Sequence, residues 1–528
     1  MPARLEGELG GPALRRGHAL RDGDLDARRA ALATAPSRAV DVAILGAGAA
    51  GLSAGWRLRR KGFAGRLALV ELEEATGGTA RGGVLQHAGR RYRHPLGAHY
   101  LPLPGEANVP LRTLLGELGA LDGDGRPAEH LLVRAPQERI FHRGFWYPGD
   151  YPYAGASAED LAELGRFEAL VERYVGLRDG AGRRAFSLPL RTSSDDAELL
   201  ALDRVDAETF LASRGFRSPR LHWLCDHACR DDYGLGLGAT SAWALLFYFA
   251  ARVPRPGSAS APFLTWPDGN APLVEHLEQA VQGDLRVGAL AFDVRSMDDG
   301  DEDPGTVRIG LVDAAGDVSA LRARRVIVAL PRFIARRVVP ALAEREAADP
   351  TAARDAFRYG PWVVANLALR DRPRGRGAPP AWDNVIYGSP SLGYVSATHQ
   401  RGRDHGPTVW TWYYALAGAD ERAERERLEA ATFEDWAQVI LSDLTPAHPD
   451  LAAQVARVDV WRWGHAMVQP RVGFLEGGKR QHRAAPLGAI HFAHSDLSGV
   501  ALFEEAFDQG VRAADEVLAA LTADGAAT

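Results

Sequence analysis

Three glycines near the N-terminus have a spacing that suits phosphate binding. Gly46, Gly48 and Gly51 lie in the sequence GAGAAG, directly after the apolar run VDVAIL. Between a strand and a helix, the first glycine permits a tight turn, the second lets the backbone approach a pyrophosphate, and the third lets the helix pack closely. The N–H groups at such a helix N-terminus favour a bound anion. The spacing therefore indicates a dinucleotide-binding turn.

The surrounding residues predict the elements that would hold this turn. A β-branched run at 39–45, a helix with apolar Leu52, Trp56 and Leu58, and a second apolar run ending at Glu71 form a βαβ pattern. Glu71 stands where an acid can bind the ribose hydroxyls of the adenosine half. The alternative is a glycine-rich turn that serves only packing.

Size and composition indicate a large globular protein. With 528 residues the chain exceeds one hydrophobic core and suggests two or three domains. The net charge of −6, without a basic block, gives no support for nucleic-acid binding. No run reaches the roughly 20 apolar residues of a membrane span. We expect a cytoplasmic protein with a small-molecule substrate and no transmembrane segment, while the oligomeric state has no sequence signal.

The two cysteines carry little chemistry. Cys225 and Cys229 are too few for a disulfide framework and too few for a zinc site without other ligands. We therefore expect two buried thiols on a helix and no metal site.

Five segments resemble motifs of the flavin-containing amine oxidase superfamily, in that family's order. The chain from Glu71 reads ELEEATGGTAR, with the Gly77-Gly78 pair at the spacing seen after the ribose acid in that family. The other segments are PLGAHYLPLP (95–104), FLTWPDGNAPLVEHL (263–277), RVIVALP (325–331) and the terminal IHFAHSDLSGVALFEEAFDQGVRAADEVL (490–518). The superfamily includes monoamine and polyamine oxidases and relatives of protoporphyrinogen oxidase.

The resemblance implies an α/β fold class and FAD as the cofactor. It implies a Rossmann-like FAD-binding domain assembled from residues 38–110, 256–335 and 485–525. An α+β substrate domain, residues 111–255 and 336–484, is interleaved with it, and residues 1–37 form an N-terminal arm. The implied cofactor contacts are Gly46, Gly48, Ala50, Gly51, Glu71, Gly77, Gly78, Arg81, Gly97, Ala98, Leu290, Ser495, Asp496, Ala501 and Leu502.

The terminal stretch would act on the flavin ring. By the resemblance, the backbone of 498–502 directs N–H groups toward flavin N1 and the C2 carbonyl, where a helix N-terminus stabilises negative charge. Ser495-Asp496 stand where the family usually has Gly-Glu, and the aspartate reaches one methylene less far. Glu504 and Glu505 follow on the first helical turns. They either suit the helix dipole or place one acid beside a cationic substrate.

Three residues are candidates for the catalytic side. Many family members carry a lysine beside flavin N5, but the matching segment YGPWVVANLAL (359–369) has none, and Asn366 is its nearest polar residue. The segment WRWGHAMVQPRVGF offers Trp463, His465 or Gln469 over the flavin. His99 follows Gly97-Ala98 and either faces the substrate or bonds the backbone. The candidate catalytic residues are His99, Asn366 and His465.

Two further clusters could have either a functional or a purely structural role. In TVWTWYYAL, a period of two puts Trp410, Trp412 and Tyr414 on one face of a strand, as an amine-binding cage or as core. In CRDDYG, the residues Arg230 to Asp232 are expected to form caps and ion pairs.

The leading hypothesis is therefore an FAD-dependent oxidoreductase that takes a hydride from a C–H bond next to nitrogen. The missing lysine favours, as an alternative, a desaturase or a protoporphyrinogen-oxidase-like dehydrogenase on an apolar substrate. A third hypothesis is a flavin-binding protein without turnover of its own.

Overall fold

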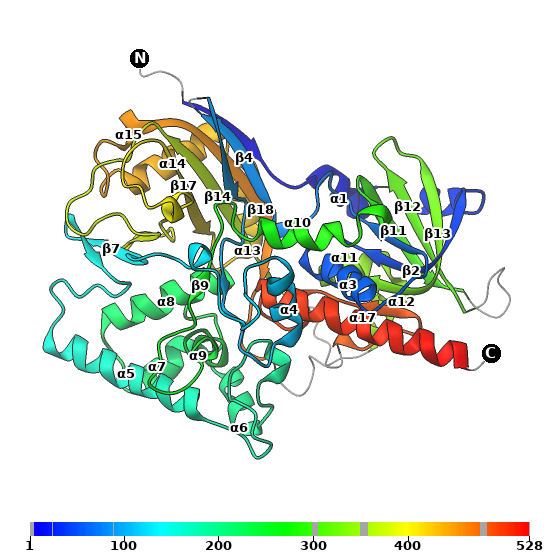
Figure 1. Cartoon of the computed structure of the whole chain (residues 1–528), viewed down its shortest axis with the longest axis horizontal. Coiled ribbons are helices and arrows are strands. Elements are labelled where there is room, and N and C mark those ends of the chain that lie inside the picture. The colour runs from blue at the N-terminus through cyan, green and yellow to red at the C-terminus, as the bar shows by residue number, and fades with distance from the viewer. Residues whose placement is uncertain are drawn as a thin grey trace. The chain divides into compact units, whose positions relative to one another are not determined.

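The computed structural model describes residues 5–23, 25–87, 89–297, 305–348, 357–475 and 483–526 (Figure 1). The chain forms two compact units, and each unit is assembled from three segments. Unit 1 comprises Met1–Gly11, Ala80–Pro272 and Tyr359–Glu476, and unit 2 comprises Pro12–Thr79, Leu273–Arg358 and Gly477–Thr528.

Unit 2 is built on a mainly parallel sheet. Strands β10, β3, β2 and β13 are parallel neighbours, β19 pairs parallel with β13, and β12 and β11 extend the sheet antiparallel. The elements are α1 (Leu14–Asp22), α2 (Leu25–Ala31), β2 (Ser37–Leu45), α3 (Ala49–Arg60), β3 (Leu67–Val70), α10 (Ala271–Gln279, which begins in unit 1), β10 (Leu285–Arg286), β11 (Ala289–Ser296), β12 (Val307–Asp313), β13 (Val318–Val328), α11 (Arg332–Val338), α12 (Pro340–Ala348), β19 (Ile490–Phe492) and α17 (Phe503–Ala526).

The end of the chain returns to the sheet that contains β2, the first strand of the unit. Residues 490–492 of β19 pair with 326–328 of β13, whose other neighbour is β2. Helix α17 then runs beside α3 (Figure 1). A Cβ at Gly510 of α17 would lie 2.1 Å from the Ala50 carbonyl oxygen, so a glycine is needed where the helices cross.

Unit 1 contains a sheet of order β1-β18-β14-β17-β16-β15-β7-β8. The strands of this sheet are β1 (Glu6–Gly10), β7 (Glu138–His142), β8 (Phe145–Pro148), β14 (Tyr359–Leu369), β15 (Asp383–Ile386), β16 (Tyr394–Ser396), β17 (Thr408–Ala415) and β18 (Val455–Val468). Two smaller sheets pair β4 (Gly82–His87) with β5 (Arg90–Pro95) and β6 (Leu101–Pro102) with β9 (Phe263–Leu264). The helices of unit 1 are α4 (Val109–Glu117), α5 (Ala158–Gly176), α6 (Ala197–Leu200), α7 (Ala207–Ser213), α8 (Pro219–Tyr233), α9 (Ala242–Ala251), α13 (Glu421–Ala430), α14 (Phe433–Leu444) and α15 (Leu451–Gln454).

The two faces of the unit 1 sheet differ in character, because side chains alternate along each strand. Trp410 and Trp412 of β17 point to one face and pack into an apolar core with Trp436 of α14. Tyr413, which follows Trp412, points to the other face and joins Trp362 and Trp463. Of the two alternatives for the aromatic row, its tryptophans therefore form core.

The fold class is the predicted α/β class. Among the described residues, none of the helices combines the length and the apolar character that crossing a membrane requires.

Candidate functional site

The glycine turn between β2 and α3 has the geometry that its sequence predicts. Gly46 has a φ of +97°, which disfavours a residue with a side chain. A Cβ at Gly51 would lie 1.8 Å from the Gly46 carbonyl oxygen, so this glycine allows helix and turn to touch. A Cβ at Gly48 would meet nothing within 4 Å. Gly48 thus leaves open the space through which a phosphate would approach the backbone.

The N-terminus of α3 supplies the donors for that space. The first bond into the helix runs from the Leu52 N–H to the Gly48 carbonyl at 3.0 Å. The N–H groups of Ala49, Ala50 and Gly51 precede it, as the leading N–H groups of any α-helix do. An open cradle above helix N–H groups fits the pyrophosphate of a dinucleotide.

Glu71 is held against this turn. One carboxylate oxygen accepts the Ala47 N–H at 2.6 Å and the other accepts the Glu73 N–H at 2.9 Å. Glu71 thus lies directly beside the turn, at the position where the sequence places an acid for the ribose hydroxyls. The Glu71 carbonyl accepts the Ala289 N–H, which brings β11 and its residue Leu290 alongside.

The glycine pair lies against the same turn. Gly77 donates to the Ala47 carbonyl at 2.8 Å and forms a parallel bridge with Gly48. Gly77 and Gly78 have φ values of +97° and +54°, which glycine adopts without strain. The structure thus brings together four parts of the predicted cofactor set, the turn, Glu71, the glycine pair and Leu290.

In the terminal stretch, Asp496 makes a contact within unit 2 that was not predicted. Asp496 is only 1% exposed, and its carboxylate accepts the Arg332 N–H at 2.7 Å. Asp496 therefore stabilises the N-terminus of α11, a contact that the sequence did not indicate. Ser495 lies in the same short turn, and Ala501 and Leu502 directly precede α17. Glu504 and Glu505 are both buried, with exposures of 4% and 0%.

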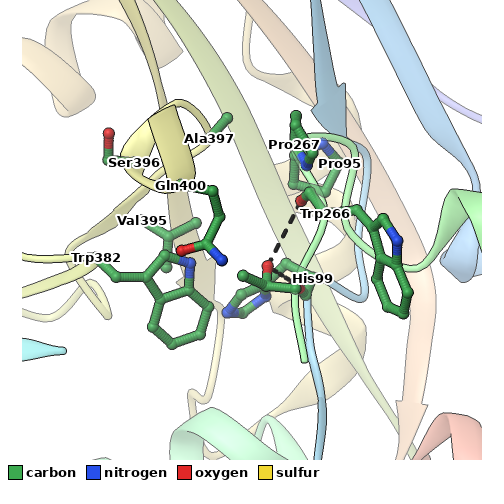
Figure 2. A pocket seen from close by; sticks show the side chains of 10 residues that line it. Pro95, His99, Trp266, Pro267, Trp382, Val395, Ser396, Ala397 and Gln400 are labelled. Carbon is green, nitrogen blue, oxygen red and sulfur yellow. Dashed lines mark hydrogen bonds between the residues drawn. The ribbon is translucent and has the colours of Figure 1, made fainter. Parts of the chain in front are cut away.

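In unit 1, His99 lies within a group of aromatic rings. Its ring stacks on Tyr413 at 4.6 Å and lies 5.6 Å from Trp382. Figure 2 shows His99 and Trp382 lining one pocket, together with Gln400. Burial lowers the pKa of His99 to about 3, so the imidazole is neutral at physiological pH.

Backbone contacts hold the loop that carries His99. The Tyr413 hydroxyl donates to the Gly97 carbonyl at 3.0 Å. The Thr265 hydroxyl donates to the His99 carbonyl at 2.9 Å, a bond drawn as a dashed line in Figure 2. The Asn270 N–H donates to the Ala98 carbonyl at 3.1 Å. Gly97 and Ala98 thus lie in a loop that two distant segments fix.

Three carboxylates that sequence reasoning missed lie close to these rings. Asp383 of β15 and Glu138 of β7 are register partners on parallel strands, so both point to the sheet face of Tyr413. Asp231 of α8 interacts electrostatically with both acids and with Tyr413. No local sequence signal marks this set, because strand pairing creates it.

The pKa values of these acids follow from burial and mutual repulsion. Burial, with the charge of Asp150, raises the pKa of Glu138 to about 7. Burial, with the charge of Asp232, raises the pKa of Asp231 to about 7. Burial, with the charge of Glu138, raises the pKa of Asp383 well above its usual range.

The ion pairs predicted for CRDDYG are present, with one exception. Arg230 pairs with Asp226 at 2.8 Å, and Arg252 pairs with Asp232 at 2.7 Å. Asp231 has no hydrogen bond or ion pair with the residues that the structure describes. Its carboxylate is therefore available to a cationic ligand.

The other two catalytic candidates lie in different surroundings. Asn366 is fully buried; its amide donates to the Pro95 carbonyl at 3.1 Å and accepts from the Thr411 hydroxyl at 2.8 Å. This geometry favours a structural role for Asn366. His465 is exposed on β18, and its ring lies 6.1 Å from that of Tyr359, outside the group around His99.

The remaining predicted contact is Arg81, which precedes β4. Its guanidinium carbon lies 4.7 Å from the centre of the Trp461 ring. Cys225 and Cys229 are buried free thiols on α8, as predicted. In the described part of the chain, no group of three or more His, Cys, Asp or Glu side chains could hold a metal ion.

Comparison with known proteins places this geometry in context. A family model described as flavin containing amine oxidoreductase matches residues 49–518. No curated protein matches the chain.

Solved structures match the chain over most of its length. A double mutant of putrescine oxidase has 18% identity and a TM-score of 0.65, covering 92% of this chain and 100% of that chain. Cyclohexylamine oxidase from Brevibacterium oxydans has 18% identity and a TM-score of 0.63, covering 92% and 99%. A CLA-producing fatty acid isomerase from P. acnes has 16% identity and a TM-score of 0.59, covering 90% and 97%. At such identities the likeness concerns the fold.

Proposed function

Because this chain belongs to the flavin-containing amine oxidoreductase family, and is thus an FAD-dependent oxidoreductase, we propose that its substrate is an amine. The substrate would lose a hydride from a C–H bond next to its nitrogen. Bound FAD supplies the chemistry that no side chain has, because it accepts a hydride at flavin N5. The protein supplies binding, orientation and charge.

The residues of unit 2 fit the FAD molecule. The open space at Gly48 and the N–H groups at the start of α3 would hold the pyrophosphate. Glu71, which two backbone bonds hold against the turn, would bind the ribose hydroxyls. These contacts position the cofactor and leave the redox step to it.

The observation that carries the amine proposal is that aromatic rings lie beside carboxylates that form no ion pair with the described residues of unit 1. Asp383 points to the same face of the sheet as Tyr413, and Trp382 directly precedes Asp383 in the chain. Aromatic faces attract a cation, and carboxylates add charge of the complementary sign. Burying a carboxylate without a cationic partner is costly, so an apolar substrate would give no reason to retain it.

His99 suits the same substrate. Its pKa of about 3 keeps the ring uncharged, so it adds no positive charge that would repel an ammonium group. Its ring stacks on Tyr413 and thereby extends the aromatic surface.

An anaerobic mixing experiment tests the proposal. The purified holoenzyme is mixed without oxygen with a panel of monoamines, diamines and polyamines, and the absorbance of oxidised flavin is followed. We expect at least one amine to bleach the flavin. If every amine leaves the spectrum unchanged, the proposal is wrong.

A second candidate is a dehydrogenase or desaturase on an apolar substrate. The observation that favours it is β14, which carries no lysine and whose Asn366 amide is bonded to Pro95 and Thr411. The fatty acid isomerase among the structural neighbours acts, by its name, on an apolar chain. Unsaturated fatty acids and reduced tetrapyrroles in the same panel, with products followed by mass spectrometry, separate this candidate from amine oxidation.

A further inference from the structure

A cavity of about 270 Å³ lies within unit 2, on its main sheet. Strand β2 contributes Arg38 to its lining, β3 contributes Ala68 and Val70, β10 contributes Arg286 and β13 contributes Ser319. Small-molecule sites usually have volumes of about 300–1,000 Å³, so this cavity suits a compact ligand. Among its described lining residues, none is a predicted contact of FAD.

Strand register directs both arginines of the cavity to one face of the sheet. Val70 and Arg286 are register partners on the parallel strands β3 and β10, so their side chains point to the same side. Arg38 of β2 is in the same way the register partner of Leu321 on β13. Val70 and Leu321 belong to one apolar core cluster. The two arginines therefore project from the face that carries this core.

The positive charge of the cavity has no negative partner. Arg38 makes no hydrogen bond or ion pair with any residue that the structure describes. Arg286 donates to the Ser319 hydroxyl at 3.2 Å and forms no ion pair within the described ranges. Asp284, the one acid among the described lining residues, is already paired with Arg59 at 2.7 Å. An anion that entered the cavity would meet two guanidinium groups without competition from a carboxylate.

Exposed arginines without a partner are common on protein surfaces, but here two of them share a cavity with an apolar floor. Arg38 and Arg286 are exposed, so a ligand can reach them from solvent. Ala68 and Val70, which lie between them in the lining, are buried. Isolated surface charges do not combine these features.

The chemistry of the lining indicates the class of ligand. A planar guanidinium matches the oxygens of a carboxylate or a phosphate with paired N–H donors. The Ser319 hydroxyl accepts from Arg286 and has its own proton left to donate. The floor of Ala68 and Val70 offers a hydrocarbon group an apolar surface. The ligand that fits is an anion with a compact apolar part.

We propose that this cavity binds a small organic anion, whose carboxylate or phosphate oxygens contact Arg38 and Arg286 and whose apolar part lies on Ala68 and Val70. The proposal concerns a site outside the predicted FAD contacts and does not depend on amine oxidation. The Glu71 N–H donates to the Arg286 carbonyl at 2.9 Å, so the site adjoins the strand that ends at the ribose acid.

Isothermal titration calorimetry of the FAD-loaded protein tests binding while the cofactor site is filled. The probes are hexanoate and phenyl phosphate, and 1-hexanol provides an apolar body without charge. We expect at least one of the two anions to bind, and hexanol to bind at least about tenfold more weakly, because it makes no charge-assisted contact. Tighter binding of hexanoate identifies a carboxylate ligand, and tighter binding of phenyl phosphate identifies a phosphate ester.

Substitutions locate the bound anion. Arg38→Met and Arg286→Met should each weaken binding of the better probe by about tenfold or more. Arg337→Met, which removes an exposed arginine of α11 in the same unit, is the matched control and should bind as the wild type does. Ser319→Ala, which should also weaken binding, provides a second route if Arg286→Met does not fold. Thermal unfolding verifies that each variant is folded.

Three outcomes would overturn the proposal. If neither anion binds, the cavity is no anion site. If both methionine variants keep the wild-type affinity, the anions bind elsewhere on the protein. If hexanol binds as tightly as the anions, the arginines recognise no charge. A protein that binds these anions but oxidises no amine would contradict the proposed substrate and leave this inference intact.

Discussion

Glu138 and Asp383 are register partners on the parallel strands β7 and β15, so two carboxylates lie side by side on one face of the unit 1 sheet. Like charges directly opposite one another destabilise a sheet. Burial and the charge of Asp150 raise the pKa of Glu138, and burial and the charge of Glu138 raise the pKa of Asp383. A bound cation would relieve this repulsion, which makes the pair a natural target for substitution.

Asp383→Asn should weaken amine binding more than it slows the chemical step. A charge-assisted contact is worth about 1.5–3 kcal/mol, so KM for an amine substrate should rise about tenfold or more, with kcat less affected. Steady-state kinetics measure the effects on KM and on kcat separately. Glu426→Gln, at an exposed ion pair on α13, is the matched control and should leave KM unchanged. An unchanged KM in Asp383→Asn would remove this acid from the substrate site.

The affinity for amines should increase as pH rises through about 7. Glu138 and Asp231 have pKa values of about 7, so both lose their proton and attract a cation more strongly above that value. KM should therefore fall across this range. Asp231→Asn should flatten the profile, which distinguishes this cause from titration of the amine itself. A wild-type profile that stays level across neutral pH would contradict the assignment.

The same raised pKa predicts a pH-dependent effect on stability. Between the ordinary value of 3.8 and about 7, the folded protein holds a proton on Asp231 that the unfolded chain has lost. The free energy of unfolding therefore falls as pH rises through this window. Asp231→Asn removes the group whose ionisation destabilises the folded protein. This variant should therefore have a higher melting temperature than the wild type above neutral pH, but not below the ordinary pKa. Calorimetry of both proteins at the two pH extremes measures this difference.

Alanine substitutions at two glycines of the cofactor turn should have different effects, one on FAD binding and the other on stability. A Cβ at Gly48 meets nothing, so Gly48→Ala should leave the apoprotein as stable as the wild type and weaken FAD binding. A Cβ at Gly51 would lie 1.8 Å from the Gly46 carbonyl, so Gly51→Ala should lower the free energy of unfolding by about 1–3 kcal/mol. Thermal unfolding and FAD titration of both variants test the contrast. Equal FAD affinity in Gly48→Ala and wild type would argue against a phosphate at this position.

Neighbouring residues of β17 should have separate roles. Trp412→Ala opens the apolar core beneath α14 and should lower the free energy of unfolding by about 3–5 kcal/mol, with little change in KM. Tyr413→Phe removes the hydroxyl that holds the Gly97 carbonyl and should change kinetics with a smaller loss of stability. Chemical denaturation and steady-state kinetics of the two variants measure this division. The reverse pattern would place the substrate on the tryptophan face.

Local sequence patterns were sufficient to predict the secondary structure around the glycine turn of unit 2. The run before Gly46, the spacing of the glycines and the acid at Glu71 predict a strand, a turn, a helix and a second strand, and the structure has all four in β2, α3 and β3. Each of these features depends on residues within one short segment. The terminal strand and helix, β19 and α17, were likewise predictable from their own residues.

Features that depend on which strands and helices pack together could be seen only in the tertiary structure. A period of two shows that Trp410 and Trp412 share a face, but only the positions of α14 and of the neighbouring strands show that this face is core. Asp496 was expected to contact the cofactor, but its bond to Arg332 depends on where α11 begins. Neither fact is encoded within the segment that contains the residue.

The sequence by itself therefore determined the fold class, the flavin family and the cofactor turn, because their signals are short-range or lie in motif order. Only the tertiary structure brought Glu138 to Asp383 and Gly10 to Trp461, residues from opposite parts of the chain. Sheet register is a long-range property, fixed by which strands pair, and side-chain alternation then sets which groups meet. For that reason the side chains that we propose to face the substrate could be identified only in the tertiary structure.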